Sequence, residues 1–195
     1  GAFARDLALA EQLAAAPTPL LLAVGGLSGS GKTTVAGLLL EHLGAVRVRS
    51  DVERKRLAGL ASGERRPAAL GAGLYGPEMT LRTYQRLHEA AAAVLQAGYP
   101  VVVDAAMLRR EERDALRALA AKLAVRCACL WCEAPLATMR LRLVRRAAGG
   151  ADASDATLAV LEMQRRLVEQ PAVGEAVLRV DTRLTSKRLD AEVER

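Results

Sequence analysis

Residues 20–33 read LLLAVGGLSGSGKT, an apolar run followed directly by a glycine-rich loop. The loop, residues 26–33, matches the phosphate-binding pattern G-x-x-x-x-G-K-[ST] at every fixed position, and a segment of helical periodicity follows it. In this pattern the glycines let successive backbone N–H groups face phosphate oxygens, and the positive end of the helix dipole adds to the attraction. The stretch therefore predicts a nucleoside-triphosphate site between a strand and a helix.

Individual residues of this loop have distinct roles in the pattern. Lys32 would reach the β- and γ-phosphates, and the Thr33 hydroxyl would hold Mg²⁺. The expected phosphate-binding set is Ser28, Gly29, Ser30, Gly31, Lys32, Thr33 and Thr34. The loop is not the dinucleotide fingerprint G-x-G-x-x-G, because Thr34 stands where the third glycine belongs. We therefore expect a nucleoside triphosphate and Mg²⁺ as cofactors.

Outward from the loop, short apolar runs alternate with longer segments of helical periodicity. The runs are too continuously apolar to have a solvated face, which is typical of buried parallel strands. The expected strands are 20–25, 45–49, 100–104, 125–132 and 177–181, and the expected helices are 32–43, 51–58, 78–97, 109–122, 135–147 and 154–169. This order predicts an α/β fold with a five-stranded parallel sheet, helices on both faces and a lid.

The composition excludes several other classes of protein. With 195 residues and 51% hydrophobic content, the chain has room for one substantial core and is neither disordered nor fibrous. Its net charge of +6 is carried mostly by arginine, because only four of the 28 basic residues are lysine. Arginine favours forked contacts with phosphate or carboxylate. Aromatic residues make up 3% of the chain, which disfavours a base-stacking surface for single-stranded nucleic acid.

Cysteine usage and hydropathy indicate the compartment. Cys127, Cys129 and Cys132 are too few and too close for a disulfide framework, and their odd number favours a reducing environment. Strand alternation would place Cys132 on the opposite face from the other two, so we expect core packing and not a metal site. The apolar stretch 7–27 is interrupted by polar residues and prolines, and falls short of the roughly 18 residues of a membrane span. We expect a cytoplasmic protein without a membrane segment.

Two glycine-rich stretches interrupt the alternation of strands and helices. Residues 59–77 form a loop longer than the usual limit of about 12–15 residues, and residues 147–155 follow an arginine-rich helix. Both are candidate lids, and we expect the principal lid near 147–155. At the N-terminal end of the sequence, helical periodicity before Pro17 predicts a helix and linker over 1–19. We interpret that segment as the end of a preceding domain.

Acidic residues follow the second and third expected strands. Asp51 and Asp104 would both lie at the carboxyl edge of the sheet, where open α/β sheets bind ligands. A carboxylate at Asp51 would accept the proton of an acceptor hydroxyl, and the alternative is a helix N-cap, although both roles can hold at once. Asp104 would lie near Mg²⁺ through water, or would orient acceptor and base. Arg54, one helical turn after Asp51, would point the same way.

Arginines gather in two further places. Arg142 and Arg146 share one helix face just before the second glycine-rich stretch, where they would neutralise a phosphoryl group in transit as a lid closes. The alternative is a salt-bridged surface helix. Three more arginines follow the third strand, and one of them, Arg113, is expected to form an ion pair. His88, on an alanine-rich helix, is expected to pack in the core and to have no catalytic role.

Four blocks of the chain resemble a group of P-loop kinases. The blocks are GGLSGSGKTT (25–34), RSDVERKRLAG (49–59), TYQRLHEAAAAVLQAGYPVVVDAAMLRREER (83–113) and RLRLVRRAAGGADASDATLAVLEMQ (140–164). The group contains the kinase domains of phage-type polynucleotide kinases, zeta toxins and gluconate kinases. Within it, the chain looks most like the ATP-binding kinase-like domains that bacteria fuse behind an aminoglycoside-phosphotransferase-like domain. The resemblance implies a P-loop NTPase fold of the nucleoside monophosphate kinase-like type. It also implies ATP as the nucleotide, a kinase domain over 20–195 and a fused N-terminal domain as partner.

The resemblance also implies roles for individual residues. In such kinases the aspartate after the second strand is the base toward the acceptor hydroxyl, which corresponds to Asp51. The arginine three residues later, Arg54, binds the acceptor. The aspartate that ends the third strand corresponds to Asp104. The lid arginines correspond to Arg142 and Arg146.

We interpret the chain as an ATP- and Mg²⁺-dependent kinase that transfers the γ-phosphoryl group to a hydroxyl of a small-molecule or nucleotide-like acceptor. The expected catalytic residues are Lys32, Asp51, Asp104, Arg142 and Arg146, and the expected acceptor ligands are Asp51, Arg54, Tyr75 and Arg113. Two alternatives remain open. One is a polynucleotide 5′-hydroxyl kinase, which would bind nucleic acid with steep salt dependence. The other is a nucleotide-binding regulatory module of a larger fusion protein.

Overall fold

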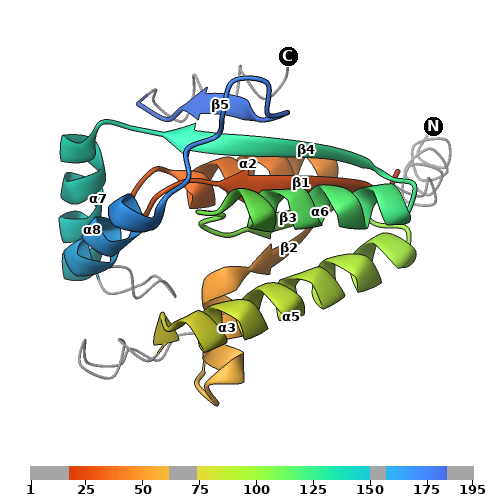
Figure 1. Cartoon of the computed structure of the whole chain (residues 1–195), viewed down its shortest axis with the longest axis horizontal. Helices are drawn as coiled ribbons and strands as arrows, with labels where there is room; N and C mark the ends of the chain where they lie inside the picture. Colours follow the sequence, from red (N-terminus) through yellow and green to blue (C-terminus); the bar gives the residue numbers. More distant parts are fainter. Residues whose placement is uncertain (1–17, 62–73, 150–156, 184–195) are drawn as a thin grey trace, which may run out of the picture.

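A five-stranded sheet forms the centre of the computed structural model, which describes residues 18–61, 74–149 and 157–183 (Figure 1). The strands are β1 (Leu20–Gly25), β2 (Val46–Arg49), β3 (Val101–Asp104), β4 (Arg126–Glu133) and β5 (Leu178–Asp181). Neighbouring strands pair in parallel in the order β2-β3-β1-β4-β5. The predicted α/β fold with a parallel sheet is confirmed, and all the strands end at one edge.

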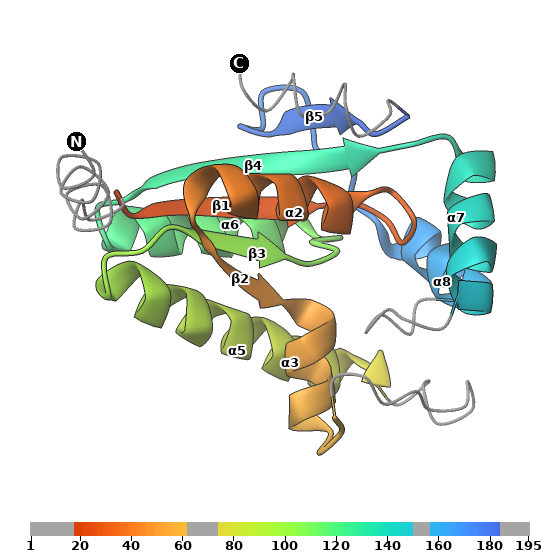
Figure 2. The same cartoon turned by 180° about the vertical axis from the view of Figure 1, so that it is seen from behind.

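Helices cover both faces of the sheet, as Figures 1 and 2 show from opposite sides. The first face carries α2 (Lys32–Leu43), and the second carries α5 (Pro77–Gln96) and α6 (Arg110–Lys122). The short α3 (Ser50–Leu57) continues directly from β2. Beyond the carboxyl edge stand α7 (Leu136–Gly149) and α8 (Leu158–Leu167), which pack on each other away from the sheet. These two helices and α3 therefore surround the edge where ligands bind in such folds.

The central strand β1 shows why these strands are continuously apolar. Leu21 and Ala23 pack against α5 and α6, whereas Leu22 and Val24 pack against α2. Each of these side chains is buried, and a fully buried leucine or valine contributes about 1.5–3 kcal/mol to folding. A strand covered on both faces has no position for a polar side chain until it reaches its end. The chemistry-bearing residues therefore lie at the strand ends.

The cysteines of β4 divide between the two faces of the sheet. Cys129 is buried on the α5 and α6 side with Cys127 packed beside it, and Cys132 is buried on the α2 side. The predicted alternation is confirmed. Across the described ranges, no helix is both long and apolar enough to cross a bilayer.

Two helices, α7 and α8, differ from the sequence-based prediction by more than one residue at an end. Helix α7 continues through Gly149 instead of ending at residue 147, and the added residues are Ala148, a strong helix former, and Gly149. Helix α8 begins at Leu158 and not at 154, since Thr157 is its N-cap and accepts the Val160 N–H at 3.3 Å. The predicted helix and linker over 1–19 lies almost wholly outside the described residues. The same holds for most of the two candidate lids, at 62–73 and 150–156.

Candidate active site

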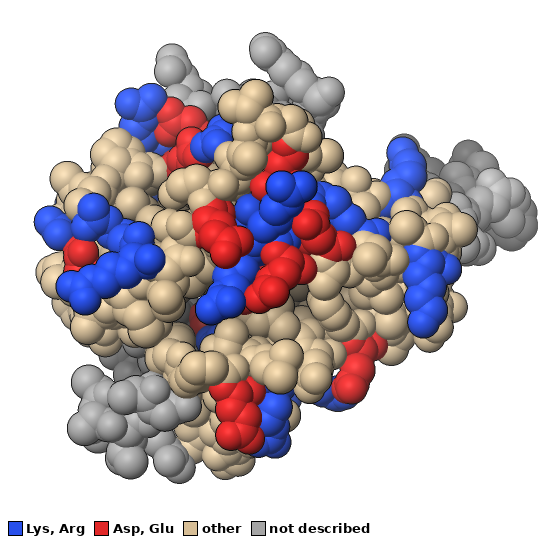
Figure 3. Space-filling model, in the orientation of Figure 1, with Lys and Arg blue, Asp and Glu red and all other residues tan. Residues whose placement is uncertain are grey.

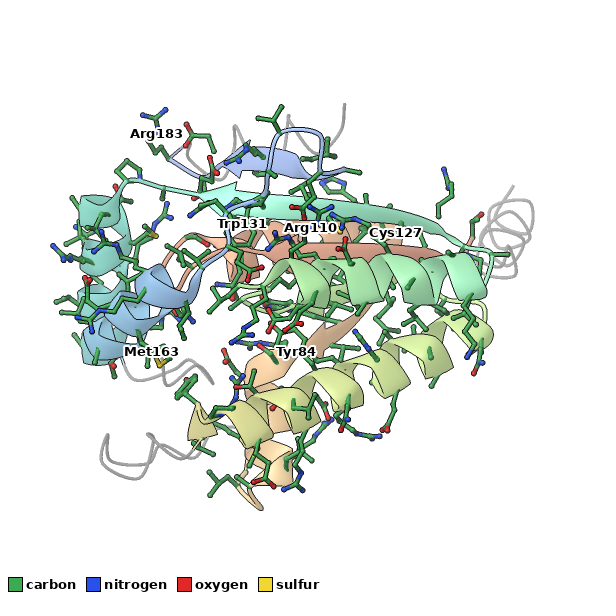
Figure 4. The ribbon with its side chains drawn as sticks, viewed as in Figure 1. Tyr84, Arg110, Cys127, Trp131, Met163 and Arg183 are labelled. Atoms are coloured by element: carbon green, nitrogen blue, oxygen red, sulfur yellow. The ribbon has the colours of Figure 1, made fainter. Side chains whose placement is uncertain are left out.

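A cavity of about 900 Å³ lies at the carboxyl edge of the sheet. Its walls come from the glycine-rich loop, α3, α5, the start of α6, and the two outer helices α7 and α8. Figure 4 labels Tyr84 on α5 and Met163 on α8, which lie on opposite sides of this region. The predicted site residues that line the cavity are Ser28, Gly29, Gly31, Lys32, Thr33, Thr34, Asp51, Arg54, Tyr75, Asp104, Arg142 and Arg146. The fold thus brings together residues that are widely separated in the sequence.

The loop geometry requires glycine at two positions. Gly29 and Gly31 have φ values of 80° and 93°, in the left-handed region that disfavours other residues. A Cβ on Gly29 would lie 2.6 Å from the Met139 carbonyl oxygen, and one on Gly31 would lie 2.9 Å from Thr182 Cβ. The loop is therefore pressed against α7 and the residue after β5. Ser30, which we predicted as a phosphate ligand, does not line the cavity, since its side chain is buried beneath the loop.

The ammonium group of Lys32 points back onto the loop. Its Nζ donates a hydrogen bond to the Leu27 carbonyl at 2.9 Å. Burial lowers the pKa of Lys32 below its ordinary value, whereas the carboxylates of Asp104 and Asp51 act in the opposite direction. The nearby charge of Arg146 lowers the pKa further. A desolvated cation beside a second cation would be stabilised by an anionic group in the cavity.

Asp104, at the end of β3, is almost fully buried and has two partners. The Thr33 hydroxyl lies 3.4 Å from its Oδ2, and Arg47 of β2 forms an ion pair with the same oxygen. Sequence reasoning missed Arg47. The strand register offered a signal, because Arg47 lies beside Val102 and so shares a sheet face with Asp104. The carboxylate therefore lies next to the hydroxyl that would hold a metal ion.

Asp51 is the second residue of α3 and not its N-cap. Arg49 occupies the N-cap position, and no side chain caps this helix. The Asp51 carboxylate is about one quarter exposed and lies 3.6 Å from Arg54 Nη1. The Arg54 guanidinium in turn lies over the Tyr75 ring, 4.9 Å from its centroid. The three predicted acceptor ligands Asp51, Arg54 and Tyr75 thus form one group on the cavity wall.

Arg142 braces the loop from α7. Its Nη1 donates to the Gly29 carbonyl at 3.1 Å, and its Nη2 donates to the Thr182 carbonyl at 2.6 Å. Thr182 also donates from its hydroxyl to the Ser30 carbonyl at 2.5 Å. Arg146, one turn further along α7, lines the cavity. The two arginines therefore both line the cavity, and Arg142 also contacts the loop.

The side chain of Gln164, on α8, accepts a hydrogen bond from a backbone N–H group of the loop. The Ser28 N–H donates to Gln164 Oε1 at 2.8 Å, and the Gln164 side chain is buried. A phosphate oxygen would compete for this same N–H group. Sequence reasoning did not single out Gln164, since its helix gave no sign of which side chain faces the loop.

The structure corrects the expectation that Arg113 binds an acceptor. Its guanidinium is 2% exposed, pairs with Glu175 at 2.6 Å and lies 5.5 Å from the Trp131 ring centroid. A further hydrogen bond joins it to the Met107 carbonyl at 2.9 Å. Arg113 does not line the cavity. Arg113 forms an internal ion pair that joins α6 to the segment before β5. The sequence analysis expected an ion pair of Arg113, and the structure contains one.

We expect Glu175→Gln to lower the free energy of unfolding by about 3 kcal/mol at pH 7, since it leaves the buried Arg113 charge unbalanced. The Arg113 contact lowers the pKa of Glu175 to about 2. The stabilisation is therefore complete above the ordinary carboxyl pKa and is lost as pH falls toward 2. Urea unfolding at pH 7 and pH 3 measures both effects. Glu89→Gln, in an exposed pair with Arg86, is the control and should change stability by less than about 1 kcal/mol.

A second part of the cavity is lined by residues that sequence reasoning did not assign to the site. Tyr84, Gln85 and His88 of α5 face it together with Glu112 of α6. We expected His88 to pack in the core, but it lines this cavity. The spacing of 84, 85 and 88 along one helix face was the available signal.

Comparison with known proteins shows the family to which the chain belongs. A family model described as AAA domain (AAA_33) matches residues 21–171. Uncharacterized proteins of Mycobacterium tuberculosis and Mycobacterium bovis are each 33% identical to the chain over 159 residues. These matches cover 80% of this chain and 32% of each relative, so the chain spans about a third of the length of the curated relatives it matches.

Solved structures with the same fold include several kinases. A gluconokinase from Sinorhizobium meliloti 1021 has a TM-score of 0.61 at 20% identity, over 91% of this chain and 89% of that one. The Mycobacterium tuberculosis APS kinase CysC, in complex with AMPPNP and APS, has a TM-score of 0.64 at 20% identity, over 91% and 96%. Chaetomium thermophilum Kti12, in complex with ADP-AlF3, has a TM-score of 0.65 at 16% identity, over 90% and 97%. The chain therefore belongs to the AAA domain family, and its fold is that of the P-loop kinases.

Proposed function

We propose that the chain is an ATP- and Mg²⁺-dependent kinase that transfers the γ-phosphoryl group to a hydroxyl of a small-molecule acceptor. The observation that carries this proposal is the shared cavity of Lys32 and Asp51. The two side chains follow different strands, and both line the same cavity. Asp51 is near enough for its negative charge to oppose the lowering of the Lys32 pKa by burial. A phosphate-binding cation and a partly exposed carboxylate thus face one space. This is the pairing that transfer to an acceptor requires.

The residues of the loop fit a triphosphate and a metal ion. The cradle at Gly29 and Gly31 leaves no room for a Cβ. The partly buried Lys32 lacks an anionic partner within hydrogen-bond distance in the described residues. The Thr33 hydroxyl and the Asp104 carboxylate lie side by side as oxygen ligands, which Mg²⁺ prefers. When bound, Mg²⁺ would neutralise charge that develops on the phosphates.

The remaining site residues have roles in binding, orientation and proton transfer. Asp51 accepts the proton of the acceptor hydroxyl, and Arg54 holds Asp51 in place. Arg142 keeps the loop in its curled form, while Arg146 places a second positive charge beside Lys32. Phosphoryl transfer needs little covalent chemistry from the protein, so positioning and electrostatic stabilisation account for the rate.

The charge distribution does not favour the polynucleotide kinase alternative. Figure 3 shows acidic and basic side chains interleaved over the middle of one face. On α6, Asp114 pairs with Arg110 and Arg117. The basic side chains over α7 and α8 include Arg140 and Arg165, and both pair with Glu162. A nucleic-acid surface would need arginines that are free to meet phosphates.

Release of ADP from Mg-ATP, measured alone and with sugars, nucleosides, aminoglycosides and 5′-hydroxyl oligonucleotides, tests the proposal. Stimulation by a small-molecule class, with phosphate recovered on that compound, supports the kinase. Stimulation by oligonucleotides alone would favour the polynucleotide kinase. Tight ATP binding with turnover that no compound raises would favour the regulatory module.

We expect Gln164→Glu to weaken Mg-ATP binding by about tenfold or more. The new carboxylate would lie against the Ser28 N–H, where phosphate oxygens bind, and like charges a few ångströms apart repel by more than about 1.4 kcal/mol. Gln164→Ala, the matched control, removes the competing oxygen without adding charge and should bind at least as tightly as the parent. Titration calorimetry measures both. Equal affinity of the two variants would contradict a phosphate position at Ser28.

A further inference from the structure

The cavity that Lys32 and Asp51 line has a second set of lining side chains, which are apolar. We call this set the apolar lining. It consists of Leu81 of α5, Leu108 before α6, and Val160, Met163 and Leu167 of α8. None of these side chains has a group that binds phosphate or Mg²⁺ or that accepts a proton. The apolar lining therefore takes no part in the proposed reaction step, and its role lies in binding a ligand.

Helix α8 has two apolar faces, and only one of them is used to pack against α7. Leu161 is fully buried in a cluster with side chains of α7. Val160, Met163 and Leu167 are spaced three and four residues apart, so they share a second face, and this face lines the cavity. Leu167 is 50% exposed and belongs to no core cluster among the described residues. The core therefore does not account for this second face.

Helix α5 has the same feature at its first turns. It packs on the sheet through the buried Leu87, Ala91 and Leu95. Leu81 lies outside this stripe, is 60% exposed, and is absent from every core cluster of the described ranges. Tyr84 of α5 and Met163 of α8 lie on opposite sides of the cavity (Figure 4). Two helices thus place apolar surface in one cavity, where neither needs it for packing.

The polar side chains that line the cavity beside the apolar lining are engaged with the protein itself. The Tyr84 hydroxyl accepts the Met107 N–H at 2.9 Å. Glu112 Oε2 accepts the Arg109 N–H at 3.0 Å, and the Arg109 guanidinium lies 3.4 Å from Glu111. These contacts fix the polar groups in place. The surface that lacks a partner on this side of the cavity is therefore largely apolar.

Apolar surface in contact with water favours a ligand that has apolar surface of its own. Each methylene group that a ligand moves from water into apolar surroundings strengthens binding by about fourfold. A ligand with a hydroxyl group on every carbon would instead lose hydrogen bonds to water against these side chains. Small-molecule sites typically combine apolar walls with a few polar groups that fix the orientation. Here the polar group for the reacting hydroxyl is the Asp51 carboxylate.

We propose that the acceptor is amphipathic, with its reacting hydroxyl group joined to an apolar ring or chain, and that the apolar lining binds this ring or chain. This inference rests on the proposed kinase function. The hydroxyl oxygen forms a bond to the γ-phosphorus while the bond from that phosphorus to the β,γ-bridging oxygen breaks. The proton goes to Asp51, and ADP leaves with the bridging oxygen.

Methyl resonances of the methionines in the full 195-residue chain test the inference without turnover. The chain has four methionines. Met163 lines the cavity, and Met107, which is 1% exposed in the core between α5, α6 and the sheet, is the internal control. With Mg-ADP present, octyl glucoside below its micelle concentration and phenyl glucoside are each compared with methyl glucoside, which has the same sugar and only a methyl group. We expect octyl or phenyl glucoside to shift the Met163 resonance with a Kd at least tenfold below that of methyl glucoside, and to leave Met107 unchanged.

Two results of this titration would overturn the inference. One is an equal Kd for the three glucosides, or no shift with any of them. The other is a Met163 shift with Mg-ADP alone to which no glucoside adds, since the apolar lining would then serve the nucleotide or the closure of α8 on α5.

Two leucines of α8 provide matched variants. Leu167 lines the cavity, whereas Leu158 is similarly exposed, at 44%, and does not line it. Leu167→Gln should raise the Kd of the tighter-binding glucoside by fivefold or more, and Leu158→Gln should leave it within twofold. Both variants should keep the Kd for Mg-ADP within twofold of the parent. An equal effect of the two substitutions on the glucoside would contradict binding at the apolar lining.

Product analysis separates this inference from the proposed function. Preferential binding of an apolar glucoside, without a phosphorylated product from any acceptor tested, would overturn the kinase function and leave the apolar lining as a ligand site. Phosphate transfer with a kcat/KM no higher for the apolar glucosides than for methyl glucoside would overturn this inference and leave the kinase function intact.

Discussion

Lys32→Met is expected to reduce the rate of ADP release by about 10²- to 10³-fold, which is the loss typical of removing one preorganised group that stabilises transition-state charge. Lys32 is partly buried, and this burial lowers its pKa. Its one hydrogen bond within the described residues goes to the Leu27 carbonyl. The Lys32 charge therefore contributes little to the stability of the free protein, and it would contribute strongly to the binding of phosphate. ATP affinity should fall together with the rate.

The stability of this variant distinguishes lost function from lost folding. Methionine keeps the length of the side chain and removes a desolvated charge, so the unfolding midpoint should stay within a few degrees of the parent value. Lys122→Met, at the exposed end of α6, is the matched control and should retain full activity. If Lys32→Met folded normally and released ADP at the parent rate, the loop would not be the triphosphate site.

Asp51→Asn is expected to reduce phosphoryl transfer by about 10²- to 10⁴-fold and to leave ATP binding within about threefold. The substitution removes the base and keeps the shape of the side chain. Asp51 is partly exposed and contacts Arg54 at 3.6 Å, so the fold depends little on its charge. Measurements of ATP affinity and of product formation with an active acceptor separate the two effects.

The control for this variant is another aspartate beside an arginine. Asp114 is half-exposed on α6 and pairs with Arg110 and Arg117, outside the cavity. Asp114→Asn should transfer phosphate at the parent rate. Transfer by Asp51→Asn at the parent rate would show that Asp51 is not the base. A loss of ATP binding in parallel with the loss of transfer would show that Asp51 contributes to binding the nucleotide.

Much of the nucleotide half of the site could be predicted because it is local in sequence. The glycines and Lys32 lie within one loop, and an apolar strand before it and a helix after it determine their geometry. Asp51 and Asp104 could be placed because parallel strands end at one edge, which is a property of the fold class. The spacing of Arg142 and Arg146 likewise placed both on one helix face, at the loop.

Arg113 shows where sequence spacing fails. Three arginines stand within five residues at the start of α6, and nothing in their spacing says which side chain points inward. Packing of α6 on the sheet directs Arg113 to Glu175, which is 62 residues away along the chain. The exposed Arg110 meets Asp114 on the same helix. Only the position of the helix decides between an acceptor ligand and an internal ion pair.

The sequence by itself determined the parallel α/β fold, the phosphate loop and the two strand-end carboxylates, because hydrophobic periodicity and loop chemistry act over short distances. Tertiary structure alone decided the strand order and the contacts that depend on it. Ser28 meets Gln164 across 136 residues, and Asp104 meets Arg47 across 57. Such contacts follow from how helices and strands pack, since burial favours many pairings that local patterns do not distinguish. The part of the cavity lined by Tyr84 and Glu112 belongs to this second group, because it exists only where α5 and α6 face the same cavity.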